Sequence, residues 1–171
     1  KTIHERLSTQ IDLHSNYGGV VPELASREHL KALLPLTQEV FVDAGVNINN
    51  IDAIGITTGP GLSGALLTGS SFACGLSEAI NCPLMPVNHL EGHILSVLLE
   101  NDTFSDKCVF PFLALLISGG HTQIVHVDNY FEMKIIGTTI DDAIGEAFDK
   151  CGKQMGLDYP AGEQIDKLAQ N

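Results

Sequence analysis

The sequence predicts a mixed α/β fold, on three observations. Short apolar runs typical of buried strands alternate with longer segments whose apolar residues follow helical spacing. A glycine-rich loop over 59–64 follows one such strand and leads into one such helix, as in open α/β sheets. The chain has 171 residues, of which 44% are hydrophobic, so it can bury one core or two small ones.

Composition limits the partners that we expect. The formal net charge of −12 argues against a general surface for nucleic acid, because phosphate binding depends on Lys and Arg. A nucleic-acid partner would need a local basic patch, a partner subunit or further sequence. We expect no membrane association, because the sequence has no apolar run of spanning length and no cleavable signal. We also expect reduced core thiols in a cytoplasmic setting, at Cys74, Cys82, Cys108 and Cys151.

In the first half of the chain, leucines at helical spacing predict a long helix that Pro35 should kink and Gly45 should cap. Alternating and continuous apolar runs predict the strands. The expected elements are a strand over 3–13, a turn over 16–19, a helix over 23–44, a strand over 51–58, a helix over 65–79, a short buried strand over 83–87 and a helical run over 94–99.

In the second half, the polar stretch 101–106 is expected to separate two lobes. The run 110–117 is almost continuously apolar, as a fully buried strand should be. Gly156 is expected to cap the last helix. The expected elements are strands over 110–117, 124–127 and 133–140, a helix from Asp141 to Met155 and a turn over 159–162.

Two histidines, His89 and His93, stand four residues apart where an expected strand passes into a helix. Residues at this spacing share one helix face, so both imidazoles can bind one divalent metal ion if a third ligand comes from elsewhere. Glu91 would lie about 200° round the helix from His89, which disfavours the His-Glu-x-x-His chemistry of zinc proteases. A second interpretation stays open, in which both histidines are polar caps.

Two glycine-rich loops could bind a ligand through backbone N–H groups. Residues 59–64 match Gly-x-Gly-x-x-Gly, but a dinucleotide site needs an acidic residue about 20 positions on, where this chain has Asn88 and His89. Close packing of helix and strand is the favoured explanation of that loop. Residues 118–123 should form a Gly-Gly hairpin turn that either cradles phosphate or is only a turn. A solvated acidic face is the default interpretation of the carboxylates that follow, Asp142, Glu146 and Asp149.

Taken together, five motifs resemble the tRNA N6-adenosine threonylcarbamoyltransferase family, which was once taken for a sialoglycoprotein endopeptidase. The motifs are Tyr17-Gly18-Gly19-Val20-Val21-Pro22-Glu23-Leu24-Ala25-Ser26-Arg27, Gly59-Pro60-Gly61, His89-Leu90-Glu91-Gly92-His93, Ser118-Gly119-Gly120-His121-Thr122-Gln123 and the run from Asp141 to Lys150. The resemblance implies an actin-like, Hsp70-like and sugar-kinase-like (ribonuclease H-like) fold of two lobes, each a mixed sheet with flanking helices. Residues 1–104 would form most of lobe I, and 105–171 the beginning of lobe II.

The resemblance also implies a reaction, a site and partners. The family transfers a threonylcarbamoyl group from threonylcarbamoyl-adenylate to the exocyclic amine of the adenosine beside the anticodon in tRNA. By this resemblance, His89 and His93 hold one divalent metal ion per subunit, iron or zinc, while Asp149 binds the ribose. The adenylate would also meet Leu116, Ile117, Ser118, Gly119, Gly120 and Gly162. The implied partners are a shortened paralogue subunit (TsaB-like) and a small ATPase (TsaE-like).

The chain departs from the family pattern at both ends. The family's opening phosphate hairpin would precede Lys1, and the asparagine and aspartate that complete the adenylate and metal sites would follow Asn171. Ala161 and Glu163 stand where the family usually has Gly and Pro. We therefore expect a fragment that is inactive alone. Two other classes fit the sequence less well: a noncatalytic dimerisation paralogue should have lost the two histidines, and a dinucleotide oxidoreductase should have the acidic residue that this chain lacks.

Overall fold

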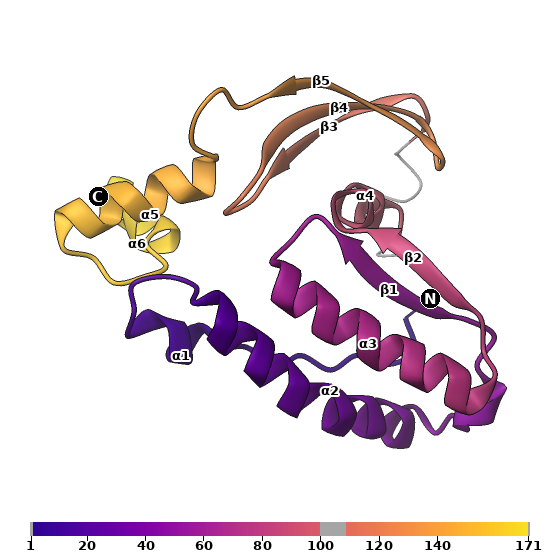
Figure 1. The fold of residues 1–171 in the computed structure, drawn as a ribbon. Helices are drawn as coiled ribbons and strands as arrows, with labels where there is room; N and C mark the ends of the chain where they lie inside the picture. Colours follow the sequence, from indigo (N-terminus) through magenta and orange to yellow (C-terminus); the bar gives the residue numbers. More distant parts are fainter. Residues whose placement is uncertain (1, 100–108, 171) are drawn as a thin grey trace. The chain divides into compact units, whose positions relative to one another are not determined.

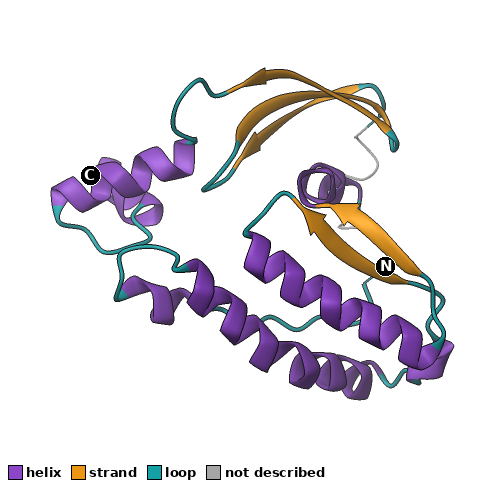
Figure 2. Ribbon diagram, in the orientation of Figure 1, coloured by secondary structure: helices purple, strands orange, loops and turns teal. Residues whose placement is uncertain are grey.

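A computed structural model describes residues 2–99 and 109–170. The chain divides into two compact units: unit 1 comprises Lys1–His14 and Val20–Gly92, and unit 2 comprises Ser15–Gly19 and His93–Asn171. Helices and strands occur in both (Figure 2), which confirms the expected mixed α/β class. The expected lobe boundary between residues 104 and 105 lies outside the described residues and stays a prediction. No helix in the two described ranges is long and apolar enough to cross a membrane.

Unit 1 contains a strand–helix–strand arrangement (Figure 1). β1 (Ile54–Gly59) and β2 (Leu84–Asn88) are parallel neighbours in a two-stranded sheet, and α3 (Ser63–Ile80) connects them. The long α2 (Pro22–Ala44) packs against α3. A Cβ on Gly64 would lie 2.4 Å from the Ser26 hydroxyl oxygen, so this glycine allows the two helices to approach closely. That contact supports the packing interpretation of the glycine-rich loop.

The expected long helix and its cap are confirmed. α2 runs without interruption through Pro35, and Gly45 ends it in the left-handed region at φ 62°. A short 3-10 turn over Ile48–Asn50 leads toward β1. α4 (His89–Leu95) follows β2 directly and gives way to a second 3-10 turn over Ser96–Leu98.

The strand expected over 3–13 is wrong. Residues 2–10 have no regular structure, and α1 (Ile11–Ser15) follows them. Side chains, not a backbone ladder, tie this segment to α2: Arg6 forms ion pairs with Asp43 and with Glu39. Gln10 reaches the other end of α2 and donates to the Ala25 carbonyl at 3.4 Å. The mixed polarity of 3–13 therefore reflects contact with a helix surface.

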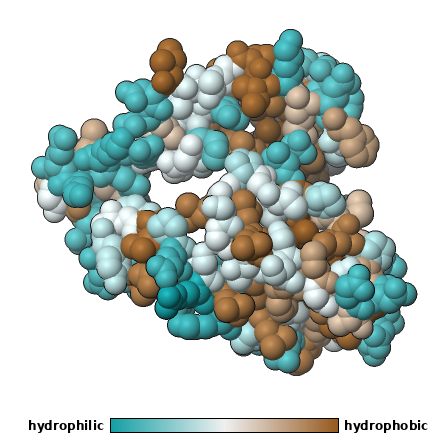
Figure 3. All heavy atoms as spheres, viewed as in Figure 1, coloured by the Kyte–Doolittle hydropathy of each residue, from teal (hydrophilic) through white to brown (hydrophobic). Residues whose placement is uncertain are grey.

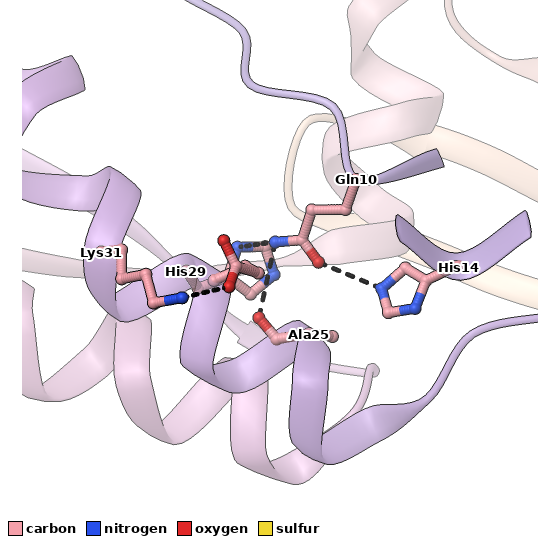
Figure 4. Close-up of polar contacts among 6 residues, drawn as sticks. Gln10, His14, Ala25, His29 and Lys31 are labelled. Atoms are coloured by element: carbon pink, nitrogen blue, oxygen red, sulfur yellow. Dashed lines mark hydrogen bonds and ion pairs between the residues drawn. The ribbon is translucent and has the colours of Figure 1, made fainter. Parts of the chain in front are cut away.

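His14 closes the connection between α1 and α2 (Figure 4). This residue is only 4% exposed, and its Nδ1 accepts the Val21 N–H at 3.3 Å. Because Nδ1 accepts, Nε2 is the ring nitrogen that donates, and it lies 3.2 Å from the Gln10 amide oxygen. Gln10 Nε2 also lies 3.3 Å from His29 Nδ1, so His29 belongs to this same structural network.

Unit 2 is built on an antiparallel sheet in the order β3-β4-β5, from β3 (Phe112–Ile117), β4 (Thr122–Asn129) and β5 (Glu132–Thr138). Val125, Val127 and Leu116 are buried. The expectation of a fully buried strand is wrong, because Leu113 and Leu115 are each 63% exposed. Antiparallel sheets bury alternate residues when one face is packed, and apolar side chains accordingly remain on the surface (Figure 3).

Two helices complete unit 2: α5 (Ile144–Met155) and α6 (Gly162–Ala169), which contact each other. A Cβ on Gly152 of α5 would lie 2.1 Å from the Ala161 Cβ, so only glycine fits this contact. Gly156 caps α5 at φ 76°, as expected. α6 was not expected, because only a turn was predicted over 159–162.

Two further expectations need correction. α5 begins at Ile144 and not at Asp141, since Ala143 is its N-cap residue and no side chain of the preceding aspartates caps it. Of the cysteines, Cys82 is buried, and its thiol donates to the Ile51 carbonyl at 3.4 Å, whereas Cys74 and Cys151 are exposed and are not core residues. Cys108 lies outside the described residues.

Candidate nucleotide-binding turn and metal ligands

The turn Ser118–His121 joins β3 to β4 and has a defined backbone. The Ser118 N–H donates to the His121 carbonyl at 2.8 Å, and the His121 N–H donates to the Ser118 hydroxyl at 3.0 Å. The N–H groups of Gly119 and Gly120 donate no hydrogen bond within the described residues. A Cβ added at either glycine would have no neighbour within 4 Å. The turn therefore presents two backbone donors in an open setting, as a phosphate cradle requires.

The first turn of α5 is fixed against this hairpin turn. The Gly145 N–H donates to the Ser118 carbonyl at 3.3 Å, and a Cβ on Gly145 would lie 2.8 Å from both that oxygen and the Gly119 Cα. The Ile144 N–H donates to the Thr122 hydroxyl at 2.9 Å. The N–H groups of Ile144 and Gly145, the first two of α5, are thus already used, whereas those of Gly119 and Gly120 are not.

Asp149 lies one helical turn beyond Gly145, about 6 Å along the α5 axis. It is half-buried, and its Oδ1 accepts the Ala161 N–H at 2.9 Å, which holds the carboxylate toward the start of α6 at Gly162. Its Oδ2 makes no hydrogen bond with any described residue. One oxygen is therefore structural, while the other can accept from a ligand hydroxyl.

The other carboxylates of this helix behave differently. Lys150 Nζ lies 2.6 Å from an Asp142 oxygen and 3.0 Å from a Glu146 oxygen. These hydrogen bonds, first the one to Asp142, raise the pKa of Lys150 to about 12. The interpretation as a solvated acidic face thus suits Asp142 and Glu146, but it does not suit Asp149.

Leu116 and Ile117 support the turn as strand residues. They pair with Gln123 and Thr122 across the β3–β4 ladder. Leu116 is buried, and it lines a cavity of about 340 Å³ in unit 2 together with His93, Ile94, Val97 and the residues Phe112–Leu115. Ile117 is exposed. Direct contact of these two residues with the adenylate stays a prediction.

His89 and His93 both lie on α4, as the sequence predicts, and both are exposed. The helix start is capped by Asn88, whose side-chain oxygen accepts the N–H groups of Leu90 at 2.9 Å and Glu91 at 3.2 Å. The two histidines are therefore not needed as caps. Within the ranges that the structure describes, no group of three metal-ligating side chains occurs, and a metal site at His89 and His93 stays a prediction.

Three residues gain a structural role that sequence reasoning did not assign. Thr122, Gly145 and Gly152 each make a contact that fixes α5. A glycine in a helix interior costs about 0.5–1 kcal/mol relative to alanine, so Gly145 and Gly152 were detectable as packing positions. Thr122 gave no such signal, because its partner is 22 residues further along the chain.

The comparisons with known proteins agree with one another. A family model described as "TsaD: tRNA N6-adenosine threonylcarbamoyltransferase" matches residues 1–171. The tRNA N6-adenosine threonylcarbamoyltransferase of Acidovorax sp. (strain JS42) is 52% identical over 164 residues, which are 96% of this chain and 46% of that protein. The protein of the same description from Christiangramia forsetii is 52% identical over 170 residues, 99% of this chain and 49% of its own length.

The chain therefore spans about half the length of these relatives. Among solved structures, YeaZ from Pseudomonas aeruginosa is similar over 64% of this chain and 50% of its own, with a TM-score of 0.46 and 20% sequence identity.

Proposed function

Because this chain belongs to the tRNA N6-adenosine threonylcarbamoyltransferase family, we propose that it is part of an acyltransferase that modifies tRNA. The substrate amine is the exocyclic nitrogen of the adenosine beside the anticodon. It attacks the carbamoyl carbon of threonylcarbamoyl-adenylate. One C–N bond forms, the C–O bond to the phosphate breaks, the amine loses a proton and AMP leaves. The proposal rests on the family, and the geometry of unit 2 supports it.

The turn Ser118–His121 is the structural observation that best supports the proposal. Gly119 and Gly120 offer two unused N–H donors at a site with no side chains in the way. Hydrogen bonds from backbone N–H groups to an anion are among the stronger ones in proteins. In the proposed complex these donors hold the phosphate of the adenylate, the group that leaves with AMP.

Asp149 and Gly162 would hold the nucleoside part of the same ligand. The Asp149 Oδ2 is the acceptor for a ribose hydroxyl, while the bond from the Ala161 N–H to Oδ1 fixes the carboxylate. Gly162 follows Ala161 at the first position of α6, where the absence of a side chain leaves room for a ligand to approach. Turn, carboxylate and α6 are all anchored to α5.

His89 and His93 would hold the divalent metal ion, iron or zinc. Both present imidazole nitrogens at a spacing suited to one ion, and their exposure leaves space for further ligands. When bound, such an ion supplies a positive charge that polarises carbonyl or phosphate oxygens of the substrate. The protein's own contribution at this point is to fix two ligands on one helix.

The wider setting is proposed from the family alone. The whole protein would have the two-lobed actin-like fold and would act in the cytoplasm. Its partners would be a TsaB-like subunit and a TsaE-like ATPase. The net charge of −12 indicates that tRNA is not attracted by this chain's general surface. Contacts with tRNA would then come from a local patch, a partner or other sequence.

The test is Gly145→Ala, with Gly75→Ala as its matched control. A methyl group on Gly145 would press on the Gly119 and Ser118 backbone, whereas one on Gly75, in the interior of α3, would meet nothing within 4 Å. Losing one or two charge-assisted hydrogen bonds should weaken the binding of threonylcarbamoyl-adenylate roughly 10- to 100-fold. Isothermal calorimetry measures this affinity directly.

Unchanged affinity in a folded Gly145→Ala protein would contradict the placement of the phosphate at this turn. An equal loss in Gly75→Ala would show that the effect is not local.

A further inference from the structure

We propose that Thr122 is a positioning residue for the nucleotide site, through which the phosphate-binding turn and Asp149 are held in one arrangement. This inference rests on the proposed function of the turn and extends it to a residue that would not itself touch the ligand.

The first N–H groups of any helix lack acceptors within the helix and must find them elsewhere. In α5 the N-cap residue is Ala143, which has no side-chain acceptor. The Thr122 hydroxyl takes the place of a local cap: it accepts the Ile144 N–H at 2.9 Å from a position 22 residues earlier in the chain. A residue of β4 therefore caps α5.

The backbone of Thr122 contributes a second connection. Its carbonyl accepts the Thr139 N–H at 2.9 Å, and the Thr139 hydroxyl donates to the Asp142 carbonyl at 2.7 Å. The segment between β5 and α5 is thus fastened near both of its ends to one residue. Thr122 also follows the turn Ser118–His121 directly in sequence.

The consequence is geometric. The turn carries the free N–H donors of Gly119 and Gly120, and α5 carries Asp149. A ligand that binds both needs a fixed offset between turn and helix. Two bonds set that offset, the Thr122 hydroxyl bond and the Gly145–Ser118 backbone bond. Without the hydroxyl, one of these two bonds is lost, the position of α5 relative to the turn is less restricted, and the ligand must restore the alignment when it binds.

The experiment compares Thr122→Val, which keeps the branched shape but removes the acceptor, with Thr122→Ser, which keeps the hydroxyl. Valine should weaken the binding of threonylcarbamoyl-adenylate roughly 3- to 10-fold, the equivalent of about one net hydrogen bond, and serine should restore it. The matched control is Thr37→Val in α2, which removes a hydroxyl that donates to the Leu33 carbonyl at 2.7 Å, away from the proposed site. It should lower stability without changing affinity.

Hydrogen exchange of the Ile144 amide, measured without ligand, gives a second readout. It should be faster in Thr122→Val than in the parent and in Thr122→Ser. Unchanged exchange would overturn the inference, whatever happens to nucleotide binding. So would parental affinity in Thr122→Val while Gly145→Ala binds weakly. If neither variant affects nucleotide binding but exchange is faster, the turn is not the phosphate site, and the proposal that Thr122 positions it fails together with that site.

Discussion

At the scale of single residues, Asp149 combines a structural bond with an unused acceptor. Sequence alone placed it in an acidic run whose default interpretation is a solvated face. The structure separates it from Asp142 and Glu146, because those two bind Lys150 while Asp149 accepts the Ala161 N–H. The carboxylate proposed to bind the ribose is thus distinguished from its neighbours by its hydrogen-bond partner and not by its residue type.

Replacing Asp149 should separate its two roles. Asp149→Ala leaves the part-buried Ala161 N–H without an acceptor and should cost about 1–3 kcal/mol of stability. Asp149→Asn keeps an acceptor oxygen, so stability should change little, while ligand binding should weaken because the charge is lost. Urea denaturation and calorimetric titration with the adenylate measure both quantities. If Asp149→Asn binds the nucleotide like the parent, the charge of Asp149 has no part in the site.

At the scale of elements, the sequence predicted those that local signals determine. α2, α3 and the hairpin of β3 and β4 follow from helical spacing, from Gly45 and from the Gly-Gly turn. Two of the failures share one cause, which is contact with a distant part of the chain. Residues 3–13 are organised by side chains of α2, and α5 starts at Ile144 because Thr122 caps it there.

The candidate site also has some features that local sequence signals predict and others that only the fold supplies. His89 and His93 could be predicted because their spacing on one helix is a local property, and the Gly119-Gly120 turn because two glycines in a hairpin are a local signal. The fit of Gly145 against Ser118 and of Gly152 against Ala161 could not be, since each needs a partner that only the fold supplies. α6 was missed because the turn before it masked the start of a short helix.

The ion pairs at the start of α5 give this element a pH dependence. The hydrogen bond to Asp142, followed by that to Glu146, raises the pKa of Lys150 from 10.5 to about 12. A raised folded-state pKa means that the ammonium form stabilises the fold fully below pH 10.5, and that this contribution disappears as the pH rises through about 12.

The difference in melting temperature between the parent and Lys150→Met should therefore be small and constant from pH 7 to pH 9, and should shrink as the pH approaches 12. Lys153→Met is the control, because Lys153 has no ion pair among the residues described. Thermal melts in matched buffers measure the difference. A gap that widens at high pH would contradict the direction of the shift.

For the protein as a whole, metal binding is proposed to depend on the two histidines of α4, His89 and His93. In the full-length protein, His89→Ala combined with His93→Ala should abolish bound metal yet leave the protein folded, because both side chains are exposed and the helix keeps its Asn88 cap. His126→Ala removes an imidazole that is paired with Asp128 at 3.2 Å and should retain the metal. Elemental analysis of the three proteins decides it: equal metal content in the double variant and the parent would refute the assignment.

The 171-residue chain by itself should bind metal weakly and transfer no threonylcarbamoyl group. α4 supplies two imidazoles, and the described residues provide no cluster of three ligands. The β1–β2 sheet has two strands, so each strand keeps an edge with no strand partner among the described residues, and such edges favour association.

The assay combines the purified chain with threonylcarbamoyl-adenylate, tRNA and the proposed partner proteins, and measures the modified nucleoside by mass spectrometry. A relative of full length serves as the positive control, since the matched relatives are about twice as long as this chain. Product at a rate comparable with that relative would show that residues 1–171 contain every group the reaction needs. The two histidines, the Gly119-Gly120 turn and Asp149 would then suffice, and a third protein ligand for the metal would be dispensable.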